Sequence, residues 1–382
     1  MTFSLTVDAK EFRAHQQHVV SEFSKVGAVV VPVIKGSGYG FGRKVLASEA
    51  TRLGSTQIAI GNVWELDQAL ADFAGQVVVL EPFNSADFAA KVVWQRILQH
   101  NADRVIVTLS STDLANAAAV NVRNAYLEAA TSLSRFGMPI QELIHAADAA
   151  HHNIAIKGLA LHLPIADPVI THVAELTTSS RQSTKKFGSR LLEIFGWLIA
   201  YQEIASQHGL PIHVSLSHVT AKDIVLLKSR CAEFEFEFSF DVRVGTSMWL
   251  GAPKALAAQG TILEIHELST NQHVGYQQVD GSGHKRLIVV SGGTAHGVAL
   301  AAPIPRTSIR KKGIALAEGF AQAMGKVKSP FSHSGKNLLF AEPPHMHVSL
   351  LWSDDLTLKI GDQLNCNVRN TTTTFDVISG LD

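Results

Sequence analysis

The chain has 382 residues, 46% of them hydrophobic and 17% charged, which is enough apolar material for a sizeable core and unlike a disordered protein. Lysine plus arginine and aspartate plus glutamate number 33 each, so the basic excess of nucleic-acid-binding proteins is missing. Two cysteines, Cys231 and Cys366, are too few for a disulfide framework. Asp8 and Glu11 stand where a signal peptide needs an apolar core, and no apolar run reaches the ~18 residues of a membrane span, so we expect a cytoplasmic protein.

Strand-like apolar runs alternate with amphipathic helical segments through the first two thirds of the chain. Two clear helical patterns cover residues 41–54 and 189–209, and the second ends in Gly209, where a helix-terminating glycine belongs. This regular alternation predicts an α/β fold, a (β/α)8 barrel of the TIM type over residues 1–253. The predicted strands are residues 28–34, 57–62, 76–82, 104–110, 124–130, 156–163, 212–217 and 240–245.

The pattern changes after about residue 253, where short strands alternate with turns rich in glycine, proline, asparagine and serine. We predict a mostly β C-terminal domain over residues 254–382, and we expect roughly the first ten residues of the chain to pair with it. Residues 303–336 are rich in proline and lysine, include one helical pattern at 314–325, and are expected to form a surface insert. The predicted strands of this domain are residues 261–269, 285–293, 345–353, 362–369 and 371–379.

The segment 31–42, VPVIKGSGYGFG, places a lysine at the end of an apolar run and four glycines behind it. In a barrel of this type catalytic groups gather at the carboxyl ends of the strands, where Lys35 falls. A lysine in partly apolar surroundings loses affinity for its proton, and the neutral amine can form a Schiff base with a carbonyl group. Taken alone, the segment leaves open a lysine that merely extends its ammonium to solvent.

The same segment resembles the cofactor-lysine segment of the alanine racemase family, in which an apolar strand is followed by K-x-x-x-Y-G-x-G. Lys35, Tyr39, Gly40 and Gly42 match this pattern. The resemblance implies that Lys35 carries pyridoxal 5′-phosphate and that the Tyr39 hydroxyl donates a hydrogen bond to its phosphate.

Later strand ends match further segments of the same family, in the same order. TSLSRFGM places Arg135 on the substrate-binding arginine, and GLALHL places His162 on a histidine that packs against the cofactor ring. Many relatives carry a carbamylated lysine seven residues before this arginine; here Glu128 supplies the anion that orients Arg135. Each of these residues alone could be an ordinary surface arginine, core histidine or strand carboxylate.

Two more segments imply the remaining cofactor contacts. HVSLS places Ser217 on a phosphate ligand, although Leu216 replaces an asparagine of the family. VRVGTSMWLG places Arg243 opposite the pyridine nitrogen, and Gly245 and Thr246 where backbone N–H groups reach the phosphate.

In the C-terminal domain the resemblance is weaker. VGY places Tyr276 on the catalytic tyrosine, and PHMHVS places Met346 on a residue whose backbone touches the substrate carboxylate. Two positions depart from the family, because His347 replaces an aspartate and Phe375 replaces a tyrosine near the substrate entrance. Relatives form homodimers in which this domain of one subunit completes the barrel site of the other, so we expect a homodimer with shared sites.

The resemblance implies a two-base amino-acid racemase, an isomerase that interconverts L- and D-alanine and so supplies D-alanine for peptidoglycan. The cofactor is the electron sink, Lys35 is the base on one face of the substrate and Tyr276 the base on the other. An unperturbed phenol ionises near pH ~10, so Arg135, and Arg243 acting through His162, would have to favour the phenolate. Because guanidinium keeps its proton, Arg243 leaves the ring a weaker electron sink, which suits racemisation better than transamination.

Three alternatives stay open at this point. One is a racemase of another amino acid, such as serine or a diamino acid, since Leu216, His347 and Phe375 put strict alanine specificity in doubt. Another is a metal-assisted lyase or dehydratase of D-hydroxyamino acids, because His345 and His347 lie on one face of a predicted strand near Glu342. The third is a non-catalytic carrier of pyridoxal phosphate.

Overall fold

The computed structural model describes residues 2–111, 113–150, 154–167, 188–300, 319 and 326–381. These residues form two compact units, which we call the barrel unit and the β unit. The barrel unit comprises residues 14–38 and 43–251, and the β unit comprises residues 1–13, 39–42 and 252–382. No helix among the described residues is long and apolar enough to cross a lipid bilayer.

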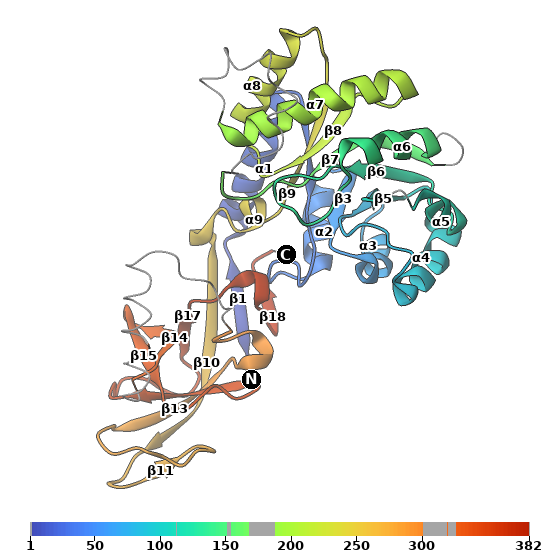
Figure 1. The fold of residues 1–382 in the computed structure, drawn as a ribbon. Coiled ribbons are helices and arrows are strands. Elements are labelled where there is room, and N and C mark those ends of the chain that lie inside the picture. Colours follow the sequence, from blue (N-terminus) through green and yellow to red (C-terminus); the bar gives the residue numbers. More distant parts are fainter. Residues whose placement is uncertain are drawn as a thin grey trace. The chain divides into compact units, whose positions relative to one another are not determined.

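The barrel unit contains eight parallel strands in the order β2-β9-β8-β7-β6-β5-β4-β3 (Figure 1). The sheet closes between β2 and β3. There, Val33 and Ala59 form an isolated parallel bridge, and the Ile34 amide donates to the Ala59 carbonyl at 2.8 Å. The predicted parallel barrel is therefore confirmed. Its strands are β2 (Ala28–Pro32), β3 (Gln57–Ile60), β4 (Gln76–Val79), β5 (Val105–Leu109), β6 (Asn124–Glu128), β7 (Ala155–Leu161), β8 (His213–Ser217) and β9 (Ser239–Val244).

Helices follow the strands and lie outside the sheet, as expected for alternating β and α segments (Figure 1). The residues at the helix ends explain where some helices stop and start. Gly209 has a left-handed backbone and ends α7, and Thr220 and Asp223 form a capping box at the start of α8. The helices are α1 (Ala9–Lys25), α2 (Arg43–Arg52), α3 (Leu66–Asp72), α4 (Phe88–Asn101), α5 (Leu114–Ala119), α6 (Ile140–Ala150), α7 (Ser189–His208), α8 (Ala221–Ala232) and α9 (Thr246–Trp249), with the 3-10 turn η1 (Val63–Glu65).

The barrel interior is mostly apolar, but Tyr126, His213 and Asp241 form a polar cluster within it. The Tyr126 hydroxyl donates to Asp241 at 2.8 Å, and His213 Nε2 lies 2.9 Å from the same carboxylate. Burial, and then the Asp241 charge, raise the pKa of Tyr126, so this phenol stays neutral. The contacts tie β6, β8 and β9 together below the ends that carry the candidate site.

The β unit is built on one eight-stranded sheet in the order β13-β16-β15-β14-β17-β10-β1-β18. The long strand β10 also pairs with β13, which closes six of the strands into a barrel. Phe3, Ile262, Phe331 and Leu351 lie in its core. The strands are β1 (Phe3–Val7), β10 (Leu256–Glu267), β13 (Arg286–Ser291), β14 (Lys328–His333), β15 (Lys336–Phe340), β16 (Val348–Ser353), β17 (Gln363–Cys366) and β18 (Val377–Ser379), and a separate hairpin contains β11 (His273–Val274) and β12 (Val279–Asp280).

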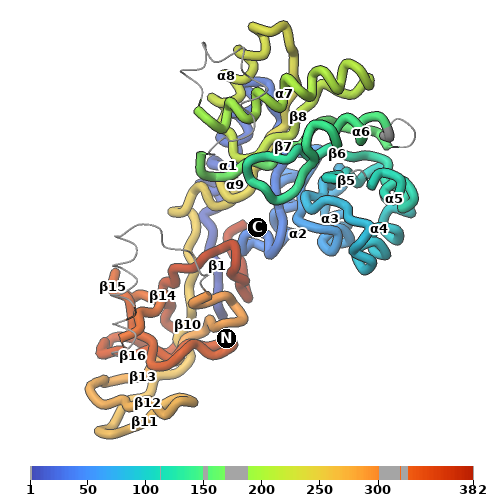
Figure 2. Tube along the Cα trace, in the orientation of Figure 1, coloured from blue at the N-terminus to red at the C-terminus, as the bar shows by residue number. Residues whose placement is uncertain are grey.

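The two ends of the chain meet in this sheet. Strand β1, blue in Figure 2, pairs antiparallel with β10, drawn in gold, and parallel with β18, near the red end of the colour bar. Within the predicted insert 303–336, residues 328–333 form strand β14 and pair with β15 and β17. The predicted helical segment 314–325 lies outside the described residues, apart from Gly319.

Candidate active site

Five of the predicted site residues gather at one end of the barrel, because parallel strands bring their carboxyl ends to the same rim. Lys35 follows β2, Glu128 ends β6, His162 follows β7, Ser217 ends β8, and Arg243 lies near the end of β9. The register pairs Ser217 directly with Arg243 across β8 and β9. The barrel therefore brings together a lysine, a buried guanidinium, an imidazole, a hydroxyl and a carboxylate.

Lys35 stands on a loop that a buried glutamate holds in place. Glu65 Oε1 accepts the amide hydrogen of Gly36 at 2.8 Å, and its Oε2 accepts that of Gly61 at 2.7 Å. Arg43 adds a hydrogen bond to the Gly36 carbonyl at 2.7 Å. The sequence analysis missed Glu65; the available signal was an acid in the turn that directly follows a buried strand.

Lys35 is exposed to solvent, yet partial burial and two nearby arginine charges act on its ammonium. Burial is the largest cause that lowers the pKa of Lys35, and the positive charges of Arg135 and Arg243 lower it further. The Glu65 charge opposes this shift without cancelling it. The neutral fraction of Lys35, which can act as a base, is therefore larger than that of an isolated lysine.

Arg243 lies buried among the strand ends. Its Nη2 donates to the Leu161 carbonyl at 2.8 Å, while its Nε is buried and has no hydrogen-bond partner among the described residues. The neighbouring Ser217 hydroxyl accepts the Leu163 amide hydrogen at 3.0 Å, and it donates to no acceptor among the described residues. Each side chain thus retains one donor without a partner in the described part of the chain.

His162 is neutral over the physiological range. Burial, and then the charges of Arg243 and Arg135, lower its pKa to about 3. Its ring lies edge-on to His218, with ring centroids 5.9 Å apart. His218 was not predicted, and its positive φ of 55° turns the chain directly after Ser217. Arg190 fixes this turn by donating to the His218 carbonyl at 2.9 Å.

Arg135 lies on a short loop between β6 and α6. A bridge between Ala129 and Met138 closes the loop, and Glu193 from α7 accepts both the amide and the hydroxyl hydrogen of Ser132. Arg135 itself is exposed, and its guanidinium lies 5.1 Å from the ring centre of Phe136. The sequence analysis also missed Glu193.

Glu128 is buried at the end of β6, and its Oε2 has no hydrogen-bond partner in the described part of the chain. Burial raises its pKa to about 6, although the positive charges of Arg243 and Arg135 act against this rise. Within the described ranges no ion pair joins Glu128 to Arg135, so the structure does not bring the predicted pair into direct contact. Their interaction is electrostatic and acts over a longer distance.

The predicted phosphate-binding residues fall in both units. Gly245 precedes the short helix α9, and Thr246 begins it, beside the end of β9. Tyr39 is buried and has a positive φ of 54°, in the segment 39–42 of the β unit. Gly40 approaches Phe375 so closely that an added Cβ would lie 3.2 Å from its ring.

Tyr276 and Met346 meet in the β unit, where they line one pocket together with Glu342, His345 and His347. Tyr276 is 88% exposed and Met346 is 66% exposed. His345 Nε2 lies 2.6 Å from Glu342 Oε1, so two of the residues considered for a metal site are hydrogen-bonded to each other. Over the described residues no group of three or more His, Cys, Asp or Glu side chains has the arrangement of a metal site.

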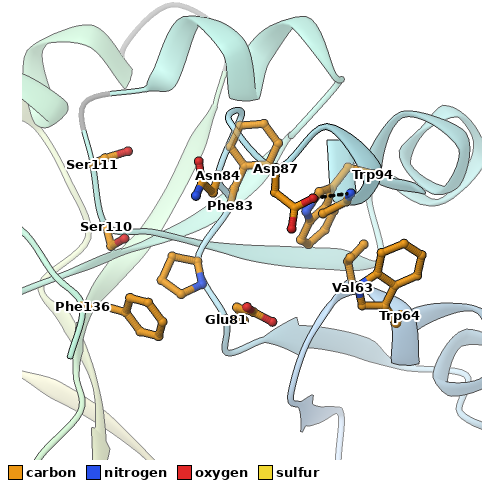
Figure 3. A pocket seen from close by; sticks show the side chains of 12 residues that line it. Val63, Trp64, Glu81, Phe83, Asn84, Asp87, Trp94, Ser110, Ser111 and Phe136 are labelled. Carbon is orange, nitrogen blue, oxygen red and sulfur yellow. Dashed lines mark hydrogen bonds between the residues drawn. The ribbon is translucent and has the colours of Figure 1, made fainter. Parts of the chain in front are cut away.

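A second pocket opens at the strand ends of the barrel unit. Its described lining residues do not include Lys35; they come from the segments after β3, β4 and β5 and from Phe136, next to Arg135. In Figure 3, Phe136 lies on one side, Val63 and Trp64 lie on the other, and Glu81 lies between them. The pocket therefore adds apolar surface and two carboxylates, those of Glu81 and Asp87, near the loop that carries Arg135.

Residues 7–253 match the family model of the alanine racemase N-terminal domain. This segment covers well over half of the chain and includes all the barrel residues discussed above. A search of curated protein sequences finds no match to the chain.

Three solved structures illustrate the similarity of fold over both units. Alanine racemase from E. faecalis is 15% identical, with a TM-score of 0.61 over 96% of this chain and 88% of that one. Alanine racemase from Bacillus anthracis with bound L-Ala-P is 15% identical, with a TM-score of 0.63 over 95% and 85%. Alanine racemase from Bartonella henselae with covalently bound pyridoxal phosphate is 16% identical, with a TM-score of 0.60 over 96% and 90%.

The raised pKa of Glu128 predicts a stability change with a definite sign. Between its unfolded value of 4.5 and its folded value of about 6, the folded protein binds more protons, so stability falls as pH rises through this interval. Replacing Glu128 with glutamine removes the buried charge. We expect the free energy of unfolding in urea to rise by about 1–2 kcal/mol at pH 8 and to change little near pH 4.5.

Glu203→Gln is the matched control, because Glu203 is an exposed glutamate on α7 of the same unit. It should leave the free energy of unfolding unchanged at both pH values. A destabilised Glu128→Gln protein at pH 8 would show that the carboxylate makes a favourable contact instead.

Proposed function

The chain belongs to the alanine racemase family, and from this premise we propose that it is a pyridoxal 5′-phosphate-dependent amino-acid racemase. We propose alanine as the substrate, with D-alanine for peptidoglycan as the product. The observation that carries the proposal is Lys35 at a strand end, with its pKa lowered beside Arg135 and Arg243. Such a lysine is accessible, has a lowered pKa, and lies near positive charge that suits an anionic cofactor and an amino-acid carboxylate.

The buried donors of the barrel fit pyridoxal phosphate. Arg243 Nε, which has no partner within the described residues, would donate to the ring nitrogen. Ser217, with its hydroxyl hydrogen still available, would bind the phosphate together with the backbone N–H groups of Gly245 and Thr246 and the hydroxyl of Tyr39. Neutral His162 would lie against the ring without adding another positive charge.

The residues of this chain would supply the bases and the orientation. Pyridoxal phosphate, when bound, supplies an electron sink that makes the substrate α-proton acidic. Lys35 would hold the proton at its Nζ on one face of the α-carbon, and Tyr276 would hold it at its hydroxyl oxygen on the other. Arg135 would bind the substrate carboxylate, with Met346 contacting it through its backbone, and the charge of Glu128 would orient Arg135.

Lys35 and Tyr276 belong to different units, and we propose that they meet between two subunits of a homodimer. The 88% exposure of Tyr276 supports this arrangement, because the described residues of one chain leave its ring largely uncovered. Each site would then combine the barrel of one subunit with the β unit of its partner.

We propose the cytoplasm as the setting. Cys231 and Cys366 are both buried free thiols. Burial raises the pKa of Cys231 to about 11 and that of Cys366 to about 12, so neither thiol is reactive near neutral pH.

The first prediction concerns the cofactor. Purified protein should absorb in the visible range, and borohydride reduction should attach the cofactor permanently to the tryptic peptide that contains Lys35. Peptide mass spectrometry identifies the site, and Lys35→Ala should abolish the label. Label on any other lysine would contradict the assignment of the site.

The second prediction concerns the reaction. Incubation with L-alanine in deuterated water should give α-deuterated alanine of both configurations, measured by mass spectrometry and chiral chromatography. Serine and diamino acids belong in the same panel, because one methylene shifts selection by only about 1–3 kcal/mol. Pyruvate or glycine production that a chelator stops would favour the metal-assisted lyase, and no exchange with any amino acid would favour a cofactor carrier.

The third prediction concerns the shared site. Lys35→Ala and Tyr276→Phe proteins should each fail to racemise alanine, and an equal mixture should recover about a quarter of the wild-type racemisation rate, since half of the dimers are mixed and half of their sites are intact. Sedimentation confirms that mixed dimers form. No recovery in mixed dimers would place both bases in one chain.

A further inference from the structure

Tyr276 occupies a tight turn at the tip of the hairpin between β11 and β12. Gly275 and Gln278 have positive φ values of 73° and 49°, and the Gln278 side chain donates to the Gly275 carbonyl at 2.9 Å. The turn directs Tyr276 away from the unit, which explains its 88% exposure. An exposed ring on a turn has few neighbours to fix its position, so its backbone must do so.

Glu342 lies beneath this turn and binds it through both carboxylate oxygens. Its Oε1 accepts the Tyr276 amide hydrogen at 3.0 Å, and its Oε2 accepts the Gln277 amide hydrogen at 3.0 Å. The approach is so close that a Cβ on Gly275 would lie 2.2 Å from Oε1. Glu342 is only 5% exposed, so the pairing is shielded from water although the tyrosine is not.

His345 extends the contact from the backbone to the ring. Its Nε2 lies 2.6 Å from Glu342 Oε1, and its ring centroid lies 4.4 Å from that of Tyr276 at an angle of 33°. Burial alone would raise the pKa of Glu342, but the hydrogen bonds from Gln277, His345 and Tyr276 outweigh it and hold that pKa below its usual value. Glu342 is therefore a carboxylate at neutral pH, with its charge directed at the turn.

We propose that Glu342, together with His345, is a positioning residue that holds the Tyr276 phenol for proton transfer. This inference rests on the proposed function, in which Tyr276 is one of two bases. Glu342 fixes the backbone on both sides of the Tyr276 peptide, and His345 supports the ring from one face. Neither residue touches the α-proton, so their loss affects the Tyr276 step and leaves the Lys35 step intact.

Glu342→Gln tests the proposal, because glutamine keeps the size of the side chain but cannot accept both amide hydrogens. Misplacement of a catalytic group by about 1 Å can cost ~100-fold in rate, so we expect racemisation to fall by ~10–100-fold. His345→Phe keeps a ring beside Tyr276 and removes the hydrogen bond to Glu342, and it should change the same quantities less. It also serves as the second variant if Glu342→Gln does not fold.

The first readout needs neither cofactor nor substrate. Hydrogen–deuterium exchange, followed by mass spectrometry of the peptide containing residues 274–278, should be faster in Glu342→Gln by ~10-fold or more, since two amides lose their acceptors. Asp355→Asn is the matched control: Asp355 accepts the Thr357 amide hydrogen at 2.9 Å and lies 3.6 Å from His333 in the same unit, away from Tyr276 in sequence. It should leave exchange at 274–278 unchanged.

The second readout separates the two proton-transfer steps. In deuterated water, Tyr276→Phe identifies the alanine enantiomer that faces Lys35, because that enantiomer still exchanges its α-hydrogen while inversion is lost. Glu342→Gln should raise the ratio of exchange to inversion for the same enantiomer and slow exchange of the other. A general folding defect would slow both enantiomers equally.

The outcomes separate this inference from the proposed function. Faster amide exchange together with the asymmetric α-exchange supports it. Unchanged amide exchange at 274–278, or equal slowing of both enantiomers, overturns it and leaves the racemase proposal standing. No α-exchange by the wild-type protein with any amino acid overturns the proposed function, and with it the role of Glu342 in proton transfer, whatever the amide exchange shows.

Discussion

Positive charge concentrated at one end of the barrel is the constraint on which the arrangement of the site depends. Lys35, Arg135 and Arg243 lie close enough for their charges to interact, and like charges in a partly dry region repel strongly. The chain reduces this repulsion by letting Lys35 lose affinity for its proton, by keeping His162 neutral, and by placing Glu65 and Glu128 among the cations. The net positive charge that remains makes this end of the barrel suited to bind an anion.

Three buried glutamates hold the loops that carry the candidate catalytic residues. Glu65 binds two backbone amides beside Lys35, Glu193 binds the loop of Arg135, and Glu342 binds the turn of Tyr276. Glu128 differs from these three, because one of its oxygens has no partner in the described structure and its pKa is raised. Carboxylates that accept amide hydrogens give structural support, whereas a carboxylate without such donors provides charge.

The barrel, and the gathering of five candidate residues at its strand ends, could be predicted, because apolar runs are local signals and parallel strands bring their carboxyl ends together. The hydrogen bonds by which glutamates hold these loops could not be predicted, because they join residues far apart in sequence. Glu193 accepts from a residue 61 positions away, and Glu342 accepts from one 66 positions away. Strand β1 falls within the first residues, which were expected to pair with the β domain, whereas strands β14 and β15 were not predicted. Strand β14 lies inside the segment 303–336, which was interpreted as a surface insert, and β15 begins at its last residue. The expected contact between Glu128 and Arg135 depended on how one loop turns, which residue spacing does not determine.

The pairing of β1 with β10 and β18 has a consequence for synthesis on the ribosome. Phe3 lies opposite Gly260, and Ser4 lies opposite Val377, so the first strand emerges long before either partner exists. At translation rates of ~5–20 residues per second, the interval before β10 is made is on the order of tens of seconds. During this time the barrel can form while β1, with its apolar Phe3, Leu5 and Val7, stays an unpaired edge that nascent-chain chaperones can recognise.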